Sequence, residues 1–245
     1  MSRLIARTCV IASILAIGAS FAEQLTREDI ERRLADGARD FTYLAAPGAD
    51  LSRLDFSGAR LFGAELQRAN LTDAKLVGCN LNVAILRDAR LIRADLRGAQ
   101  MSSSVFADAD LANADLRNAR MMGNFERANL EGANLEGVKG GADMRNQPMG
   151  LIRLVLTGAR LKGARLRSAD LSRADLSYAD LRQADLRDAD LSRANLSGAD
   201  FTGATLTNAD LEGAQIHNAI FKGAVDIATV KGLETAEGKE TAVLE

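Results

Sequence analysis

The side chains that could carry out chemistry are carboxylates spaced five residues apart. Asp170, Asp175, Asp180, Asp185 and Asp190 follow one another at this interval. A carboxylate pair can act as general acid and base only when its members lie together and burial shifts the pKa of one. On a backbone that turns every five residues, successive carboxylates point in different directions. We therefore interpret the series, and the arginines that alternate with it, as a solvated charged surface.

Residues typical of metal sites and nucleophilic sites are scarce. His217 is the single histidine, and it has no cysteine near it in the sequence. A metal site needs several such ligands. Cys79 occupies a repeat position that usually holds alanine, so we interpret it as a small buried side chain. The sequence predicts a protein that is not an enzyme and that holds no metal and no cofactor.

Each of these carboxylates belongs to a five-residue repeat, Ala-Asp-Leu-x-x. The repeat fills residues 51–137 and 156–225, where 32 pentads all carry Leu, Phe, Met or Ile at the central position. On an α-helix five residues advance about 500°, and on a flat strand leucines five apart point to opposite faces. Neither element would gather the leucines on one side. The backbone must therefore change direction in every pentad.

Four pentads of this kind would close a square coil of about 20 residues. Ala and Leu are two residues apart and can both face inward, while the Asp between them faces water. The two residues after Leu are rich in Ser, Gly, Asn and Asp, which favour turns. At about 20 residues a coil, residues 49–225 would form a solenoid of about 8–9 coils. Neighbouring coils would stack at the strand spacing of about 4.8 Å.

Tandem Ala-Asp-Leu-x-x repeats resemble the pentapeptide repeat family, and the resemblance covers roughly residues 49–225. It implies an all-β fold, the right-handed quadrilateral β-helix. The best-understood members imply one function, that of a DNA mimic that binds and protects topoisomerases. This chain differs from them in charge, because residues 51–137 hold 11 basic and 11 acidic side chains and residues 156–225 hold 9 of each. Balanced charge also predicts no nucleic-acid partner.

The repeat is irregular in two places. Met121 and Phe125 are four residues apart instead of five, and Leu135 and Leu156 are 21 apart, one more than a coil. We expect the lost and the gained residue to cancel, which would leave one continuous solenoid with an irregular coil at about 138–155. The 20-residue coil also predicts two stacked aromatic pairs, Phe106 with Phe125 and Phe201 with Phe221.

The two ends of the chain differ from the repeat. In residues 23–48, Thr26-Arg27-Glu28-Asp29 predicts a capping box and a short amphipathic helix from Arg27 to Ala35, which would cap the solenoid. Residues 226–245 predict a C-terminal cap, with a flexible tail from Glu234 onward.

Residues 1–22 have the pattern of a secretory signal peptide. Arg3 and Arg7 precede an apolar run from Cys9 to Ala19, which is too short to span a bilayer. Small residues then predict cleavage after Ala22, and the alternative is a retained N-terminal anchor. We therefore expect a periplasmic or secreted protein with no stable membrane span after cleavage.

Apolar residues at outward positions are the remaining candidates for function. In the four-sided scheme several of them follow one edge of the first block, and a second group lies in the irregular coil. Exposed apolar rows can mark a surface for a protein partner or for a homodimer, although scattered apolar surface residues are common. The first group is Phe62, Val83, Ile85, Val105 and Met122; the second is Met144, Arg145, Gln147, Pro148 and Met149.

These observations favour a non-enzymatic, exported protein that serves as a rigid scaffold for protein interaction. The topoisomerase-protecting DNA mimic is the alternative, and it requires a cytoplasmic protein. An enzyme would need a pocket, which a narrow core filled with Leu and Ala does not offer.

Overall fold

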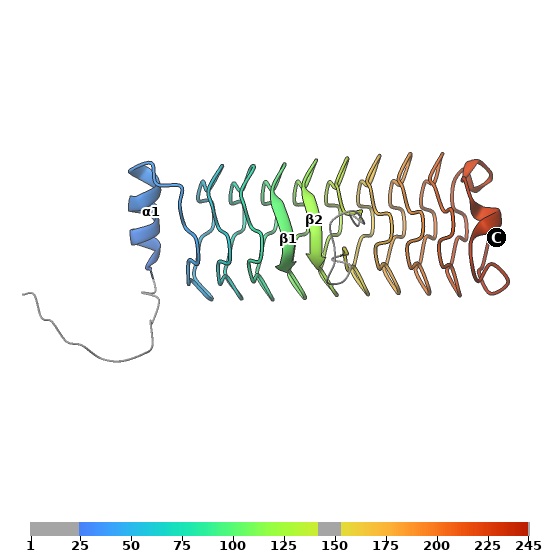
Figure 1. The fold of residues 1–245 in the computed structure, drawn as a ribbon, viewed down its shortest axis with the longest axis horizontal. Helices are drawn as coiled ribbons and strands as arrows, with labels where there is room; N and C mark the ends of the chain where they lie inside the picture. Colours follow the sequence, from blue (N-terminus) through green and yellow to red (C-terminus); the bar gives the residue numbers. More distant parts are fainter. Residues whose placement is uncertain (1–24, 142–152, 245) are drawn as a thin grey trace, which may run out of the picture.

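A computed structural model describes residues 25–141 and 153–244, which form a rod of stacked coils with one helix at its N-terminal end (Figure 1). The helix is α1 (Arg27–Ala35). Two sides of neighbouring coils are straight enough to be strands, β1 (Gln100–Val105) and β2 (Arg120–Asn124), and they pair in parallel. Two 3-10 helices, η1 (Ile227–Thr229) and η2 (Leu233–Thr235), lie in the last coil.

Each pentad forms one side of a coil through a fixed set of backbone hydrogen bonds. In the pentad that holds Leu191, the N–H of Asp190 donates to the carbonyl of Ala169 (2.9 Å), and the carbonyl of Asp190 accepts from Leu171 (2.8 Å). The Asp position is therefore the bridge residue, and its own N–H and carbonyl both bond to the coil before it. The ladders that follow from this define four sides of the rod, A to D, which begin at bridge residues Asp40, Ala45, Asp50 and Asp55.

The corner after each leucine is a tight turn. The N–H of Ala174 donates to the carbonyl of Leu171 (3.0 Å), and Arg173 between them has a φ of 62°. This second turn residue has a positive φ throughout the regular coils, which explains why glycine, asparagine and aspartate are frequent there.

The leucines and alanines fill the inside of the rod, as the pentad pattern predicts. Nearly all are at most 1% exposed. Phe106 stacks on Phe125 with ring centroids 4.6 Å apart, and Phe201 stacks on Phe221 at 4.8 Å. Both stacked pairs are therefore confirmed, and their spacing equals the distance between coils.

The two irregularities of register do not cancel, so this expectation was wrong. Arg120 pairs with Lys139, 19 residues later, and Lys139 pairs with Asp170, 31 residues later. The residue missing between Met121 and Phe125 is lost on side A. Leu135 and Leu156 are separated by two sides and eleven further residues, 142–152, which lie outside the described part of the chain. The ladders continue across this point, as the pairing of Asn124 with Val155 shows.

Helix α1 closes the N-terminal end. Thr26 and Asp29 form the capping box, and Ile30 is fully buried against the first coil. Arg27 donates to the carbonyls of Asp50 (2.7 Å) and Ser52 (3.1 Å), which have no earlier coil to pair with. The first coil begins at Asp40, earlier than the boundary at residue 49, because Phe41 and Leu44 already face the core.

The C-terminal residues form a last coil with six residues in each side. Lys231, Glu237 and Val243 pair with the coil below. The hydroxyls of Thr229, Thr235 and Thr241 accept from the N–H groups of that coil at 3.0–3.2 Å. In a regular coil these N–H groups donate to a backbone carbonyl in the turn of the next coil, and here the threonine hydroxyl is the acceptor instead. The expectation of a flexible tail after Glu234 was wrong, because a six-residue spacing conceals the repeat.

Candidate interaction surface

The aspartates of the pentads hold the turns of the coil. One oxygen of Asp180 accepts the backbone N–H of Arg182 (3.1 Å), and both oxygens accept from the Arg182 guanidinium. The hydrogen bonds to Arg182 lower the pKa of Asp180. Asp50 accepts the backbone N–H of Ser52 in the same way, and hydrogen bonds from the side chain and backbone of Ser52 lower the pKa of Asp50. These carboxylates have structural partners two residues away, which sequence reasoning missed although the Asp-Leu-x spacing is regular.

The cysteine and the histidine are not brought to a reactive site. Cys79 is buried, its thiol donates to the carbonyl of Phe56 (2.8 Å), and burial raises its pKa to about 12. His217 is exposed on side B, where its ring lies over Gly238 of the last coil. Within residues 25–141 and 153–244 no three His, Cys, Asp or Glu side chains form a group that could hold a metal.

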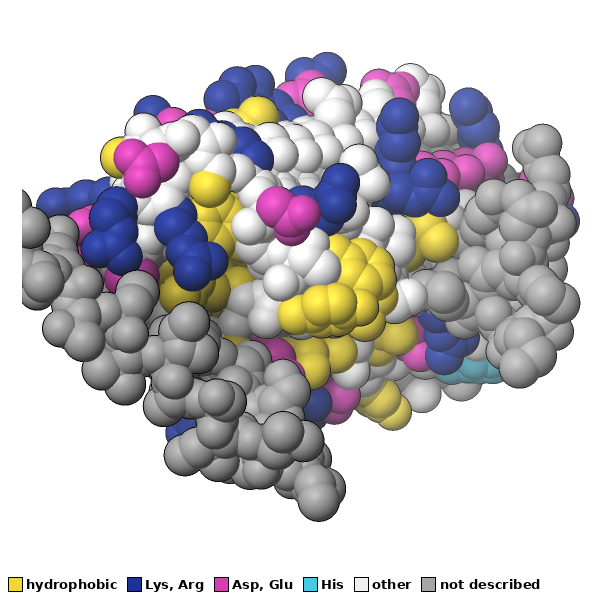
Figure 2. All heavy atoms as spheres, turned by 60° about the vertical axis from the view of Figure 1, so that its left-hand side comes forward, with side chains coloured by type: hydrophobic (Ala, Val, Ile, Leu, Met, Phe, Trp, Pro, Cys, Tyr) yellow, Lys and Arg dark blue, Asp and Glu magenta, His cyan; other side chains and the backbone are white. Residues whose placement is uncertain are grey.

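The predicted apolar row lies along the corner between sides A and B, in the first four coils. It consists of Phe62, Val83, Ile85 and Val105, together with Tyr43 in the coil before them, and we call these five residues the apolar edge. Ile85 and Val105 are bridge residues that pair with each other. Val83 is 48% exposed and Tyr43 is 65% exposed. Figure 2 shows hydrophobic side chains exposed among charged ones on the flank of the rod.

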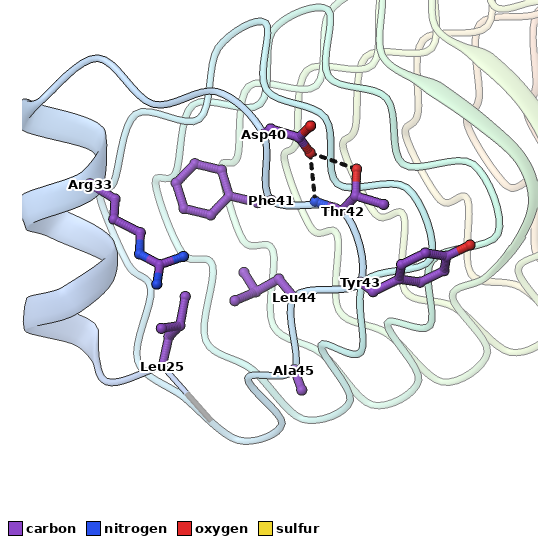
Figure 3. Close-up of a pocket in the computed structure, with 8 residues that line it drawn as sticks. All are labelled: Leu25, Arg33, Asp40, Phe41, Thr42, Tyr43, Leu44 and Ala45. Atoms are coloured by element: carbon purple, nitrogen blue, oxygen red, sulfur yellow. Dashed lines mark hydrogen bonds between the residues drawn. The ribbon is translucent and has the colours of Figure 1, made fainter. Parts of the chain in front are cut away.

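Tyr43 extends the edge toward α1. Its ring meets Phe62 edge-on, with centroids 5.9 Å apart, and covers Gly63 of the next coil. In Figure 3 the ring points away from a cavity of about 260 Å³ between α1 and the first coil, into which Leu25, Arg33 and Leu44 project. The cavity is smaller than a typical ligand site. Tyr43 precedes the first counted pentad, so the sequence search for outward apolar residues did not reach it.

Val83 has an unfavourable backbone conformation. Its φ is 62°, in the left-handed region, and it is the one β-branched residue with a positive φ among those the structure describes. A branched side chain in this region is a marked outlier that costs stability. Such outliers concentrate at functional positions. The strain and the exposure of Val83 therefore favour the apolar edge as a binding surface.

Met122 does not belong to this surface, which corrects the sequence prediction. It is only 6% exposed, because the coil that begins at Arg120 lacks one turn residue and β2 runs straight across the corner. Gly123 makes this possible, since a Cβ atom there would lie 2.4 Å from the carbonyl oxygen of Ser104. The second predicted group, Met144, Arg145, Gln147, Pro148 and Met149, lies outside the described residues.

The square coil and its pentads agree with a comparison to known families. A model of pentapeptide repeats matches residues 48–82, 84–123, 151–188 and 184–223, in eight copies. The chain belongs to the pentapeptide repeat family. The fold of this family is a right-handed β-helix, so the handedness of the solenoid follows from membership of the family. No curated protein matches the sequence.

Solved structures of pentapeptide repeat proteins resemble this chain. HetL, a pentapeptide repeat protein involved in heterocyst differentiation regulation from the cyanobacterium Nostoc sp. strain PCC 7120, is 31% identical over 90% of this chain and 95% of its own, with a TM-score of 0.36. QnrB1, a plasmid-mediated fluoroquinolone resistance protein, is 19% identical over 79% and 92%, with a TM-score of 0.59. The second likeness concerns the fold alone.

A pentapeptide repeat protein from the Arabidopsis thaliana thylakoid lumen is 30% identical over 53% of this chain and 69% of its own, with a TM-score of 0.33. No helix within residues 25–141 and 153–244 is long and apolar enough to cross a membrane.

Proposed function

We propose that this chain is an exported, non-enzymatic scaffold that binds a protein partner through the apolar edge. The observation that carries the proposal is Val83, a half-exposed and strained side chain in the middle of that edge. A glycine or asparagine at this position would relieve the strain, as in many other coils. The presence of valine is explained when a partner contacts it.

The neighbouring residues support the same surface. Phe62, Ile85 and Val105 are each half-buried, so each one presents part of an apolar side chain while its backbone remains in the ladder. A partner can therefore bind without any change in the rod. Export rests on residues 1–22 as a cleavable signal peptide, and N-terminal sequencing of the native protein would test it by finding Glu23 first.

A pull-down from the periplasmic fraction, with the mature chain as bait, tests the function. Ile85→Asp or Val105→Asp should remove a partner that the unaltered chain retains, because a carboxylate would be buried without a counter-charge in the interface. Circular dichroism must show an unchanged rod in both variants. Unchanged capture by folded Val105→Asp would contradict the proposal.

The DNA-mimic alternative is less well supported by the charges. In the coils after residue 153, aspartates such as Asp180 and Asp185 are paired with Arg182 and Arg187 on the same side of the coil. Paired charges leave a weak net field, whereas a mimic of DNA must present phosphate-like negative charge. A topoisomerase-protection assay on the mature chain tests this alternative directly.

A further inference from the structure

Side A next to the apolar edge contains cations but no acids over several coils. From Arg60 to Gly141, the segments of side A are 60–64, 80–84, 100–104, 120–123 and 139–141, and their only charged residues are Arg60, Arg120 and Lys139. Asn80, Asn82 and Gln100 provide neutral amides between them. Sides B, C and D of the same coils carry both signs, so this half of side A is distinct.

The charged groups that face the edge from other elements are few. Arg60 has Asp40 at 3.5 Å. Glu65 is a bridge residue of side B next to the edge, and Arg68, Arg87, Asp88 and Asp108 lie farther along side B. A partner that covers the edge and extends over the next two coils of side A would therefore meet the apolar side chains, Arg60 beside them, and Arg120 and Lys139 beyond Val105. An acidic flank on the partner complements these cations.

The spacing of the edge distinguishes between two shapes of partner. The edge offers apolar contacts in four successive coils, from Tyr43 to Val105, and three coil spacings are about 14 Å. Three turns of an α-helix rise about 16 Å, whereas three steps of two residues along a strand cover about 20 Å. A helix that lies along the rod axis can thus place about one apolar residue over each coil. The same-face residues of a strand are spaced too widely to match the coils.

We propose that the apolar edge binds an acidic amphipathic α-helix of a partner protein, parallel to the rod axis, with its acidic flank over Arg60, Arg120 and Lys139. This inference rests on the proposed function and specifies the partner of the same surface. The backbone of these coils is already paired on both sides, so binding depends on side chains and not on addition of a strand.

Synthetic helical peptides of about five turns provide the test. The first peptide carries a leucine stripe flanked by glutamates, the second replaces the glutamates with lysines, and the third has the composition of the first with the stripe scrambled. The first should bind the mature protein about tenfold more tightly than the others. Its affinity should fall when NaCl rises from about 0.1 M to 1 M, which shortens the screening length from about 10 Å to 3 Å.

Matched variants localise the binding. Arg120→Glu should weaken the acidic peptide about tenfold, while Arg90→Glu on side C, an equally exposed arginine of a bridge position, should leave its affinity unchanged. Val83→Asp should abolish binding, and it alters a half-exposed side chain that the core does not need. Equal binding of the lysine peptide, or equal losses in Arg120→Glu and Arg90→Glu, would overturn the inference.

The outcomes separate the two proposals. Capture of a partner that depends on Val105, combined with no preference for the acidic helix, would refute the inference and leave the proposed function intact. If neither the captured partner nor the peptide responds to changes at the edge, both proposals fail.

Discussion

At the scale of single residues, aspartate does two things in this chain. Its side chain accepts the N–H that lies two residues later and so closes the corner, and in many pentads it also binds an arginine of the same coil. Asparagine does the first of these equally well, as Asn195 does toward Ser197. Because Asp is more frequent than Asn at this position, the stability of the rod depends on the titration of these carboxylates.

The pH dependence of stability follows from these groups. The pKa values of Asp50, Asp55, Asp180 and Asp185 are lowered by hydrogen bonds in the folded state. Near pH 4 the unfolded chain thus binds more protons than the rod, so their stabilising contribution is present above about pH 4 and is lost as pH falls further. The urea midpoint should be lower at pH 3 than at pH 7.

A non-titrating control isolates this effect. Asp180→Asn with Asp185→Asn keeps an acceptor for each turn N–H but removes two titrations, so the difference between pH 3 and pH 7 should shrink. An equal difference in the control and the unaltered chain would assign the pH effect to other groups.

Val83 predicts a conflict between stability and binding. Val83→Gly removes the cost of a left-handed β-branched residue, about 1 kcal/mol, and should raise the melting temperature by about 2–4 °C for a rod of this size. The same change should weaken binding of the partner, because it deletes the middle of the apolar edge. A variant that melts lower than the unaltered chain would show that Val83 is not strained.

At the scale of the coil, a tyrosine in the second turn position constrains the coil that follows. The Tyr43 ring lies over Gly63, and the Tyr178 ring lies over Gly198 in the same way, with ring carbons 2.6 Å from where a Cβ would be. The side chain leans toward the C-terminal end of the rod in both cases. A tyrosine ring at this position thus occupies the space that a side chain would need one coil later, where the chain has glycine.

Gly198→Ala tests this dependence. The substitution combines left-handed strain, about 1 kcal/mol, with a clash against Tyr178, so it should lower the melting temperature more than Gly98→Ala, where a Cβ has open space. In a Tyr178→Ala background the two glycine substitutions should cost the same. Equal costs in the presence of Tyr178 would mean that the ring moves aside freely.

At the scale of the whole molecule, residues 142–152 are eleven residues beyond what the coil between Lys139 and Asp170 needs. Without them, Lys139-Gly140-Gly141 would continue directly into Arg153-Leu154, which completes one pentad before bridge residue Val155. Arg153 would take the second turn position, which arginine already occupies at Arg173 and Arg193. The coil would then measure 20 residues from Lys139 to Asp170.

Deletion of residues 142–152 should therefore leave the rod intact. We expect the circular dichroism spectrum and the melting temperature to match those of the full chain within about 2 °C. Deletion of residues 143–152 is the matched control, because one extra residue breaks the five-residue register and should destabilise the coil. Equal melting of both deletions would contradict this register.

The sequence predicts the coil well because its period excludes every other regular structure. Inward Leu and Ala, the phenylalanine stacks and the apolar edge apart from Tyr43 follow from counting in fives. Counting in fives fails where a side of the coil does not have five residues. At Met122 a turn residue is missing and β2 runs straight, and after Val225 each side has six residues. Strain at Val83 was also hidden, since φ at a turn is visible only once the turn is placed.

The one-directional pairing of the bridge residues has a consequence for how the chain is made. The N–H and the carbonyl of each bridge residue find their partners in the coil before it, and in the first coil the carbonyl of Asp50 finds Arg27 of α1. Every ribosome releases the N-terminus first, so each new set of four pentads meets a finished template as it emerges. The rod can thus fold coil by coil from the N-terminus. Helix α1 would provide the first template, and the last coil, with Thr229, Thr235 and Thr241, would be added at the end.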